Sequence, residues 1–114
     1  MNLLLDTHAV IWFITEDDQL PVEIKELIED TTNTCLVSIA SLWEMGIKYA
    51  LGKLDVKADL KKIFELIVQS GLTILPITIT HILTNTTLSF HHRDPFDRLI
   101  IAQAKSEGLT RRSI

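Results

Sequence analysis

Residues 91–104 read His-His-Arg-Asp-Pro-Phe-Asp-Arg-Leu-Ile-Ile-Ala-Gln-Ala, and they predict an apolar helix that begins with two carboxylates. Asp94 is a good N-cap, and Pro95 suits the first turn, where a backbone N–H is not needed. Asp97 follows Asp94 by three residues, so both carboxylates lie near one end of the helix. Gly108 predicts the end of this helix. Acids at these positions are also common in ordinary helices, because they complement the helix dipole.

The composition is typical of one folded domain spanning residues 1–114, of which 46% are hydrophobic and 23% charged. No apolar run approaches the ~20 residues of a membrane span, and Asp6 interrupts the apolar start, so we expect neither a membrane segment nor a signal peptide. The single cysteine, Cys35, excludes an internal disulfide and favours a cytoplasmic location. The net charge of −4 argues against a broad basic surface for nucleic acid.

Short apolar strands alternate with helical stretches along the chain. The expected strands are residues 2–5, 34–38 and 72–75. The expected helices are residues 7–14, a segment opened by Pro21, residues 41–51, a segment capped by Asp59 and ended by Gly71, and the helix described above. Residues 77–88 stay ambiguous, because threonines lower helix propensity while apolar residues keep helical spacing. The alternation predicts an α/β fold of three layers, α/β/α, around a short central parallel sheet.

Two further acids stand where this topology would bring them close to Asp94 and Asp97. Asp6 follows the first strand, and Glu44 lies in the third expected helix. Ligands of open α/β sheets bind beyond the carboxyl ends of the strands, so we expect the four acids to converge there. Structural roles remain open for both residues. Asp6 also suits a turn or cap, and Ser41-x-x-Glu44 matches a capping box.

Converging carboxylates repel one another unless a cation lies between them. Two carboxylates ~5 Å apart repel by roughly 3 kcal/mol at an effective dielectric constant of ~20. Carboxylate oxygens suit Mg²⁺ or Mn²⁺, and these ions also bind phosphate oxygens. A metal ion so placed lowers the pKa of a bound water and stabilises charge on a phosphodiester. The four acids therefore predict metal-assisted hydrolysis of a nucleic-acid strand.

Three motifs occur in order along the chain. They are Leu-Leu-Asp-Thr-His-Ala at 4–9, Ser-Leu-Trp-Glu-Met-Gly-Ile-Lys at 41–48 and His-Arg-Asp-Pro-Phe-Asp-Arg-Leu-Ile-Ile-Ala-Gln-Ala at 92–104. Together they resemble the PIN-domain family, in particular the VapC-like toxins of bacterial type II toxin–antitoxin pairs. The resemblance implies a PIN-like fold and a Mg²⁺- or Mn²⁺-dependent endoribonuclease that cuts tRNA or another structured RNA. It also implies a homodimer and a cognate antitoxin whose tail covers the site.

The resemblance places Asp6, Glu44 and Asp97 at the acidic metal site of the family. Asp94 matches an extra acid of an Asp-Pro-Phe-Asp-Arg subgroup, and it ranks below Asp97 because its N-cap position already explains it.

Two other residues have lower-ranked roles at this site. Thr7 would orient the Asp6 carboxylate or a bound water. Arg98 would contact a phosphate or the carboxylates of the inhibitor, unless it forms an ion pair on the helix surface.

The end of the sequence departs from the family pattern, which often has a further acid in a last short strand. Residues 111–114 read Arg-Arg-Ser-Ile, so we expect the fourth carboxylate and most of that edge strand to be missing. A missing edge strand would leave its neighbour unpaired. The alternative function is therefore a weakly active or inactive PIN protein that dimerises and binds antitoxin without cutting RNA.

Other residues carry weaker signals. The histidines suggest zinc only weakly: His8, His81, His91 and His92. Three aromatic residues suit base stacking but fit core packing better: Trp12, Phe13 and Trp43. Three lysines suit an RNA path but fit a solvated helix face better: Lys48, Lys53 and Lys57. A phosphoacceptor signalling domain would need an acid at the end of the third strand, where the sequence has Leu75-Pro76.

Overall fold

The computed structural model describes residues 1–89 and 94–112. Within these residues four strands form one sheet in the order β3-β2-β1-β4. The strands are β1 (Asn2–Leu5), β2 (Thr34–Ser38), β3 (Thr73–Leu75) and β4 (Thr110–Arg112). Every pairing between neighbouring strands is parallel, which confirms the parallel sheet that the alternating pattern predicts.

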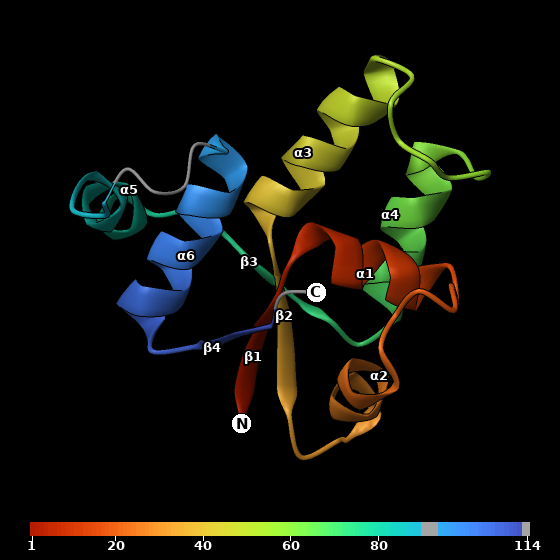
Figure 1. The fold of residues 1–114 in the computed structure, drawn as a ribbon, viewed down its shortest axis with the longest axis horizontal. Helices are drawn as coiled ribbons and strands as arrows, with labels where there is room; N and C mark the ends of the chain where they lie inside the picture. The colour runs from red at the N-terminus through yellow and green to blue at the C-terminus, as the bar shows by residue number, and fades with distance from the viewer. Residues whose placement is uncertain (90–93, 113–114) are drawn as a thin grey trace.

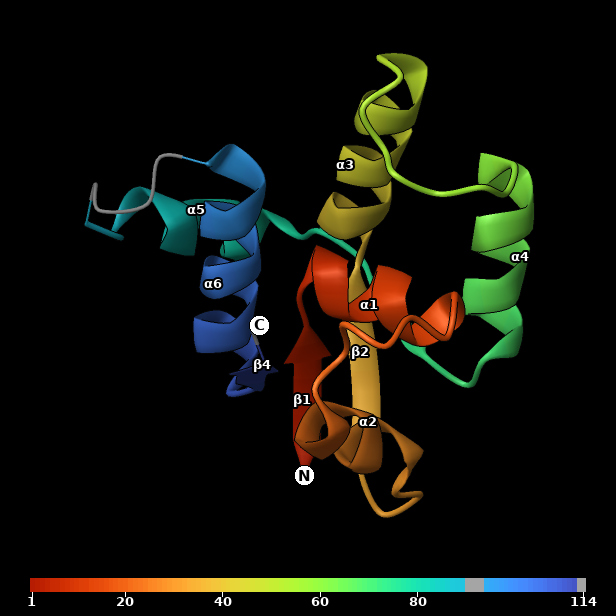
Figure 2. The same ribbon diagram turned by 45° about the vertical axis from the view of Figure 1, so that its right-hand side comes forward.

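Six helices surround this sheet in the described residues. They are α1 (Thr7–Ile14), α2 (Val22–Glu29), α3 (Ile39–Ala50), α4 (Leu60–Gln69), α5 (Ile79–Thr86) and α6 (Pro95–Glu107). Helices α5 and α6 lie together on one side, α1, α2 and α4 lie on the other, and α3 continues from the end of β2 (Figures 1 and 2). None of these helices is long and apolar enough to cross a membrane.

The core divides into two clusters because successive side chains of a strand point to opposite faces of the sheet. In β1, Leu3 and Leu5 join the larger cluster, which extends into α1, α2, α3 and α4. Leu4 faces the other way and packs with Ile100 and Ala104 of α6. All three leucines are fully buried. The two clusters confirm the three-layer α/β/α fold.

Helix α3 begins earlier than the sequence pattern suggests. Its N-cap is Ser38, whose hydroxyl accepts a hydrogen bond from the backbone N–H of Ala40 at 3.0 Å. Ser41 and Glu44 both lie inside the helix and are buried. The capping-box interpretation of these two residues is therefore wrong. Strand β2 runs directly into α3, so the cap falls on the last residue of the strand.

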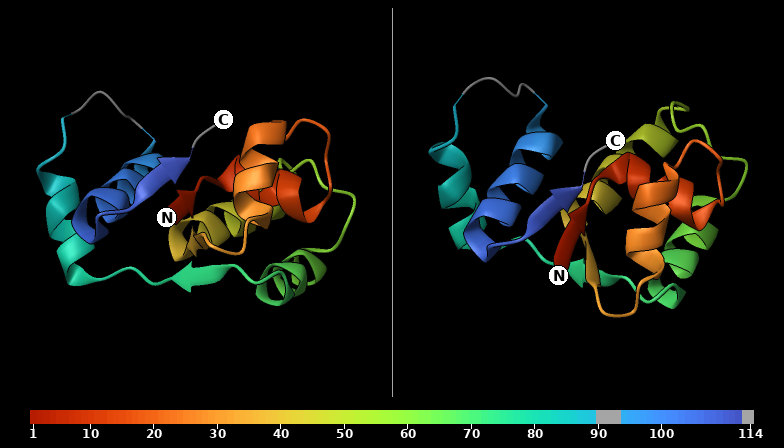
Figure 3. Two further views of the ribbon diagram at one scale, coloured as in Figure 1. Left: turned by 90° about the horizontal axis from the view of Figure 1, so that it is seen from below. Right: turned by 60° about the horizontal axis from the view of Figure 1, so that its bottom comes forward.

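The edge strand that was expected to be mostly missing is present as β4. It pairs in parallel with three of the four residues of β1, and the backbone N–H of Asp6 donates to Arg112 O at 3.1 Å. Gly108 ends α6 with φ 66°, a left-handed conformation that suits glycine, and turns the chain back to the sheet. Figure 3 shows β4 running alongside β1. Because β1 is so short, three residues are enough to cover it.

The ambiguous segment at 77–88 contains helix α5. Thr78 and His81 form a reciprocal capping box: the Thr78 hydroxyl accepts from the His81 N–H, and the Thr78 N–H donates to His81 Nδ1. The buried His81 ring also contacts Glu107 of α6, with Nε2 2.7 Å from Oε1. The cap and this contact between helices outweigh the weak helix propensity of the threonines.

The burial of Cys35 in β2 gives a test of the fold. The residue is 7% exposed, and burial raises the pKa of its thiol. Thiolate is the reacting form, and each unit of raised pKa lowers the thiolate fraction about tenfold. We expect DTNB to label the native protein about tenfold or more slowly than the urea-unfolded chain at mildly alkaline pH. Equal rates, after correction with free cysteine in the same urea, would contradict the placement of β2 in the core.

Candidate active site

A cleft of about 320 Å³ collects the acids that the sequence predicts to converge. Asp6 lies at the carboxyl end of β1, Glu44 comes from α3, and Asp94 and Asp97 come from the start of α6. The other residues that line the cleft are Thr7, His8, Lys48, Ile100 and Arg111. The predicted convergence of the four carboxylates is therefore observed.

Asp6 combines a structural contact with a place in the cleft. It is the N-cap of α1, and its Oδ1 accepts a hydrogen bond from the backbone N–H of Ala9 at 2.8 Å. The cap role that the sequence leaves open for Asp6 is thus real, and it does not exclude a role in the cleft. The cap sets the position of the carboxylate at the junction between β1 and α1.

Glu44 is buried, with 6% of its surface exposed, and has two close partners. The Thr7 hydroxyl donates to Glu44 Oε1 at 2.7 Å, and Lys48 Nζ lies 2.7 Å from Oε2. The Thr7 hydroxyl is also 3.0 Å from the hydroxyl of Ser41. The Thr7 hydroxyl therefore contacts Glu44 and Ser41. The sequence instead predicts that Thr7 orients the carboxylate of its neighbour Asp6 or a bound water. Lys48, one turn along α3, lies in the cleft rather than on a solvated helix face.

The two acids of α6 have different surroundings. Asp94 is exposed and caps the helix, because its Oδ1 accepts from the N–H of Phe96 at 2.9 Å and from that of Asp97 at 3.4 Å. Asp97 forms a short ion pair with Nη2 of Arg111 in β4. Arg111 is a cleft residue that the sequence does not indicate, since nothing marks residues 110–112 as a strand that ends at the acids.

Arg98 belongs to the packing of α6 against α5. Its guanidinium donates to the carbonyl oxygens of Ser89 at 2.7 Å and Asn85 at 3.1 Å, with Leu88 O at 3.5 Å. The last carbonyls of a helix lack partners within the helix, and a positive charge suits that end of the helix dipole. Arg98 is not among the described residues that line the cleft. These contacts hold α6 against the end of α5, and the roles that the sequence suggests for Arg98 stay predictions.

The donor chemistry of the cleft suits a divalent ion, but the arrangement of the donors does not. Four carboxylates offer the oxygen ligands that Mg²⁺ and Mn²⁺ prefer. Glu44 and Asp97, however, each hold a cationic side chain, Lys48 and Arg111. Over residues 1–89 and 94–112, no three His, Cys, Asp or Glu side chains form a group that could hold a metal ion. Internal cations neutralise these two acids instead.

The described residues that suggest zinc lie in separate places. His8 lines the cleft, while His81 is buried and contacts Glu107. Cys35 belongs to the larger core cluster. His91 and His92 lie outside the described residues.

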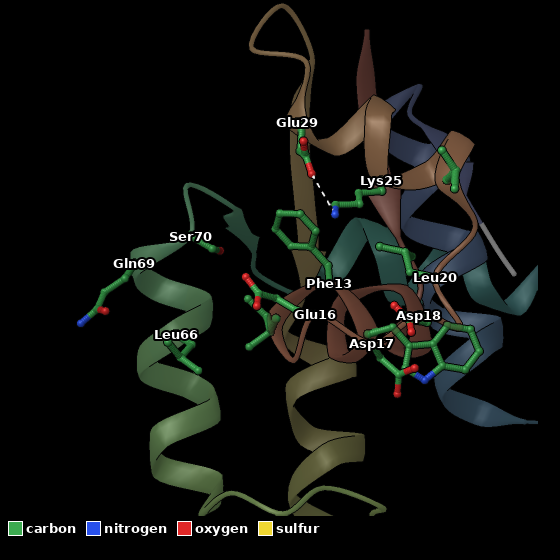
Figure 4. A pocket seen from close by; sticks show the side chains of 13 residues that line it. Phe13, Glu16, Asp17, Asp18, Leu20, Lys25, Glu29, Leu66, Gln69 and Ser70 are labelled. Atoms are coloured by element: carbon green, nitrogen blue, oxygen red, sulfur yellow. Dashed lines mark ion pairs between the residues drawn. The ribbon is translucent and has the colours of Figure 1, made fainter.

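A larger pocket of about 630 Å³ lies between α1, α2 and the end of α4, and it shares no lining residue with the acidic cleft (Figure 4). Apolar residues form part of its wall, among them Trp12, Phe13, Leu20 and Leu66. Three acids follow one another near them, and Lys25 pairs with Glu29 at 3.8 Å. The apolar pattern predicts core positions for Trp12, Phe13 and Trp43. Trp12 and Phe13 pack partly against the core while also lining this pocket. The prediction is wrong for Trp43, which is 60% exposed on α3.

The fold and the cleft together define an α/β protein with carboxylates gathered beyond the ends of its parallel strands. The sequence matches the model of the PIN domain over residues 3–111. The chain therefore belongs to the PIN-domain family.

One similar solved structure is the crystal structure of VapBC2 from Rickettsia felis bound to a DNA fragment from their promoter. The match has a TM-score of 0.69 and 21% sequence identity, and it covers 97% of this chain and 85% of that chain. At this identity the similarity shows the fold. No curated protein matches the sequence.

The hydrogen bond between Thr7 and Glu44 can be tested by substitution. Thr7→Val removes the hydroxyl but keeps the shape, which leaves a buried carboxylate oxygen without this donor. We expect the free energy of unfolding in urea to fall by about 1–3 kcal/mol. Thr7→Ser, which keeps the hydroxyl, should lose less. A Thr7→Val protein as stable as the parent would show that this contact does not hold Glu44.

Proposed function

We propose that this protein is a VapC-like toxin that hydrolyses phosphodiester bonds in RNA with Mg²⁺ or Mn²⁺. The convergence of Asp6, Glu44, Asp94 and Asp97 in one cleft of a PIN-family chain carries the proposal. Membership of this family supports a nuclease, because PIN domains are generally nucleases. RNA as the substrate, tRNA or another structured RNA, and the divalent ion come from the resemblance of the three motifs to VapC-like toxins.

The ion would be held by Asp6, Glu44 and Asp97, after Lys48 and Arg111 have left Glu44 and Asp97. A bound ion would supply a water of lowered pKa and stabilise negative charge on the phosphate. Cap contacts position Asp6, and Thr7 positions Glu44. Asp94 adds charge at the mouth of the cleft while it caps α6.

Two cationic side chains support a phosphate-containing substrate. Lys48 and Arg111 both line the cleft, beside the acids. Each is paired with an acid of the cleft, and each would be available to a phosphate oxygen once an ion takes the oxygen atoms of that acid.

We further propose a homodimer and a cognate antitoxin whose tail covers the acidic cleft. The similar structure from Rickettsia felis, which contains VapBC2, supports an antitoxin as a partner. Exposed apolar side chains one turn apart on α3 support a protein interface: Ile39, Trp43 and Ile47. The free thiol of Cys35 supports a cytoplasmic location.

A PIN protein that binds antitoxin without cutting RNA is the second candidate. The ion pairs of Glu44 with Lys48 and of Asp97 with Arg111 favour it, because each engages a carboxylate that the ion would need. The two candidates share the fold and the partners, and they differ in whether RNA is cleaved.

Cleavage of a total tRNA pool with Mn²⁺ or Mg²⁺ tests the proposal. We expect discrete fragments from the parent and a loss of roughly 100-fold in rate for Asp6→Asn. A neutral amide would hold the ion less tightly than a carboxylate and so weaken the charge stabilisation that the ion supplies. Asparagine is also a good N-cap, so α1 should remain intact.

Asp18→Asn is the matched control, since it removes an acid from the other pocket and should cut at the parental rate. If well-folded parent yields no metal-dependent fragments, the nuclease proposal fails for this chain and the second candidate stands.

A further inference from the structure

We propose that Arg111 is an internal competitor of the divalent ion. Its guanidinium neutralises Asp97, and it must leave that carboxylate before Asp97 can bind a cation. This inference rests on the proposed metal-dependent function. It assigns a regulatory task to a residue that lies outside the three motifs.

The backbone directs Arg111 into the cleft. Arg111 pairs in register with Leu4 of β1, whose side chain faces α6 in the smaller core cluster. Residues paired in register point to the same face of a sheet, so the Arg111 side chain also projects towards α6. Asp97 lies in the first turn of that helix, and Nη2 of Arg111 reaches its Oδ1. The next residue, Arg112, points to the opposite face and does not line the cleft.

A guanidinium and a divalent ion cannot share one carboxylate oxygen easily, because both are positive and repel each other at short distance. The Oδ1 atom of Asp97 already accepts from Arg111. Binding of a metal ion to this atom therefore competes with the ion pair. The apparent metal affinity is reduced by the fraction of molecules in which Arg111 holds Asp97.

Two features of the ion pair between Arg111 and Asp97 allow Arg111 to leave the carboxylate. The Arg111 and Asp97 side chains are 27% and 31% exposed, so water can replace the contact on both sides. The Nε atom of Arg111 is buried and finds no acceptor within the described part of the chain, which disfavours this conformation. Arg98 offers a contrast, since its guanidinium bonds several carbonyls at the end of α5 and holds two helices together.

Titration calorimetry with MnCl₂, without RNA, tests the inference. We expect Arg111→Gln to bind Mn²⁺ roughly tenfold more tightly than the parent, a size typical of changes next to a metal ligand. Arg112→Gln is the matched control, because it removes the same charge from the same strand outside the cleft. Its Mn²⁺ affinity should equal that of the parent.

Thermal unfolding gives a second measurement that does not depend on activity. Without metal, Arg111→Gln should melt below the parent, because the ion pair between Arg111 and Asp97 is lost near the other acids. With added Mn²⁺ this difference should shrink and reverse, since a ligand that binds more tightly stabilises more.

Arg111→Lys supports the comparison if Arg111→Gln does not fold. Lysine keeps the charge but lacks the planar fork of arginine, so we expect an Mn²⁺ affinity between those of the parent and the Gln variant. If well-folded Arg111 variants bind Mn²⁺ no more tightly than the parent, the inference is wrong while the metal-dependent function stands. If neither the parent nor the variants bind Mn²⁺, both are wrong.

Discussion

The parallel pairing of β1 with β2 and β4 is the constraint on which the rest of the structure depends. All three leucines of β1 are fully buried, and the strand has a partner on each edge. Parallel neighbours end at the same edge of a sheet, so the chain leaves β1, β2 and β4 beside one another. That edge receives Asp6 directly, Glu44 through α3, and Arg111 from β4. The acidic cleft is thus a consequence of strand register.

The charges in the cleft follow from placing several carboxylates close together in a partly buried space. Burying a carboxylate without a partner lowers the stability of the fold by more than an exposed ion pair raises it. The structure meets this cost from within the chain, since Thr7 and Lys48 contact Glu44, and Arg111 contacts Asp97. These internal partners stabilise the fold, and they oppose any ion that needs the same oxygen atoms.

Local signals made most of the fold predictable from the sequence. The cap at Asp94 and the stop at Gly108 are both observed, because each depends on a few neighbouring residues. The family pattern includes a last short strand, but Thr-Arg-Arg carries no apolar pattern, so only the pairing with β1 shows that β4 is present. The start of α3 was misplaced because Ser38 and Ser41 are both good caps, and only the length of β2 decides between them.

The site likewise contains features that local sequence signals predict and features that only the direction of a side chain decides. Asp97 and Arg98 are adjacent in one motif, yet neighbouring residues of a helix point about 100° apart. Asp97 therefore faces the cleft, while Arg98 faces the end of α5. Motif membership predicts that both residues matter, but it does not predict that one lines the cleft and the other packs two helices together. The direction of each side chain makes that assignment.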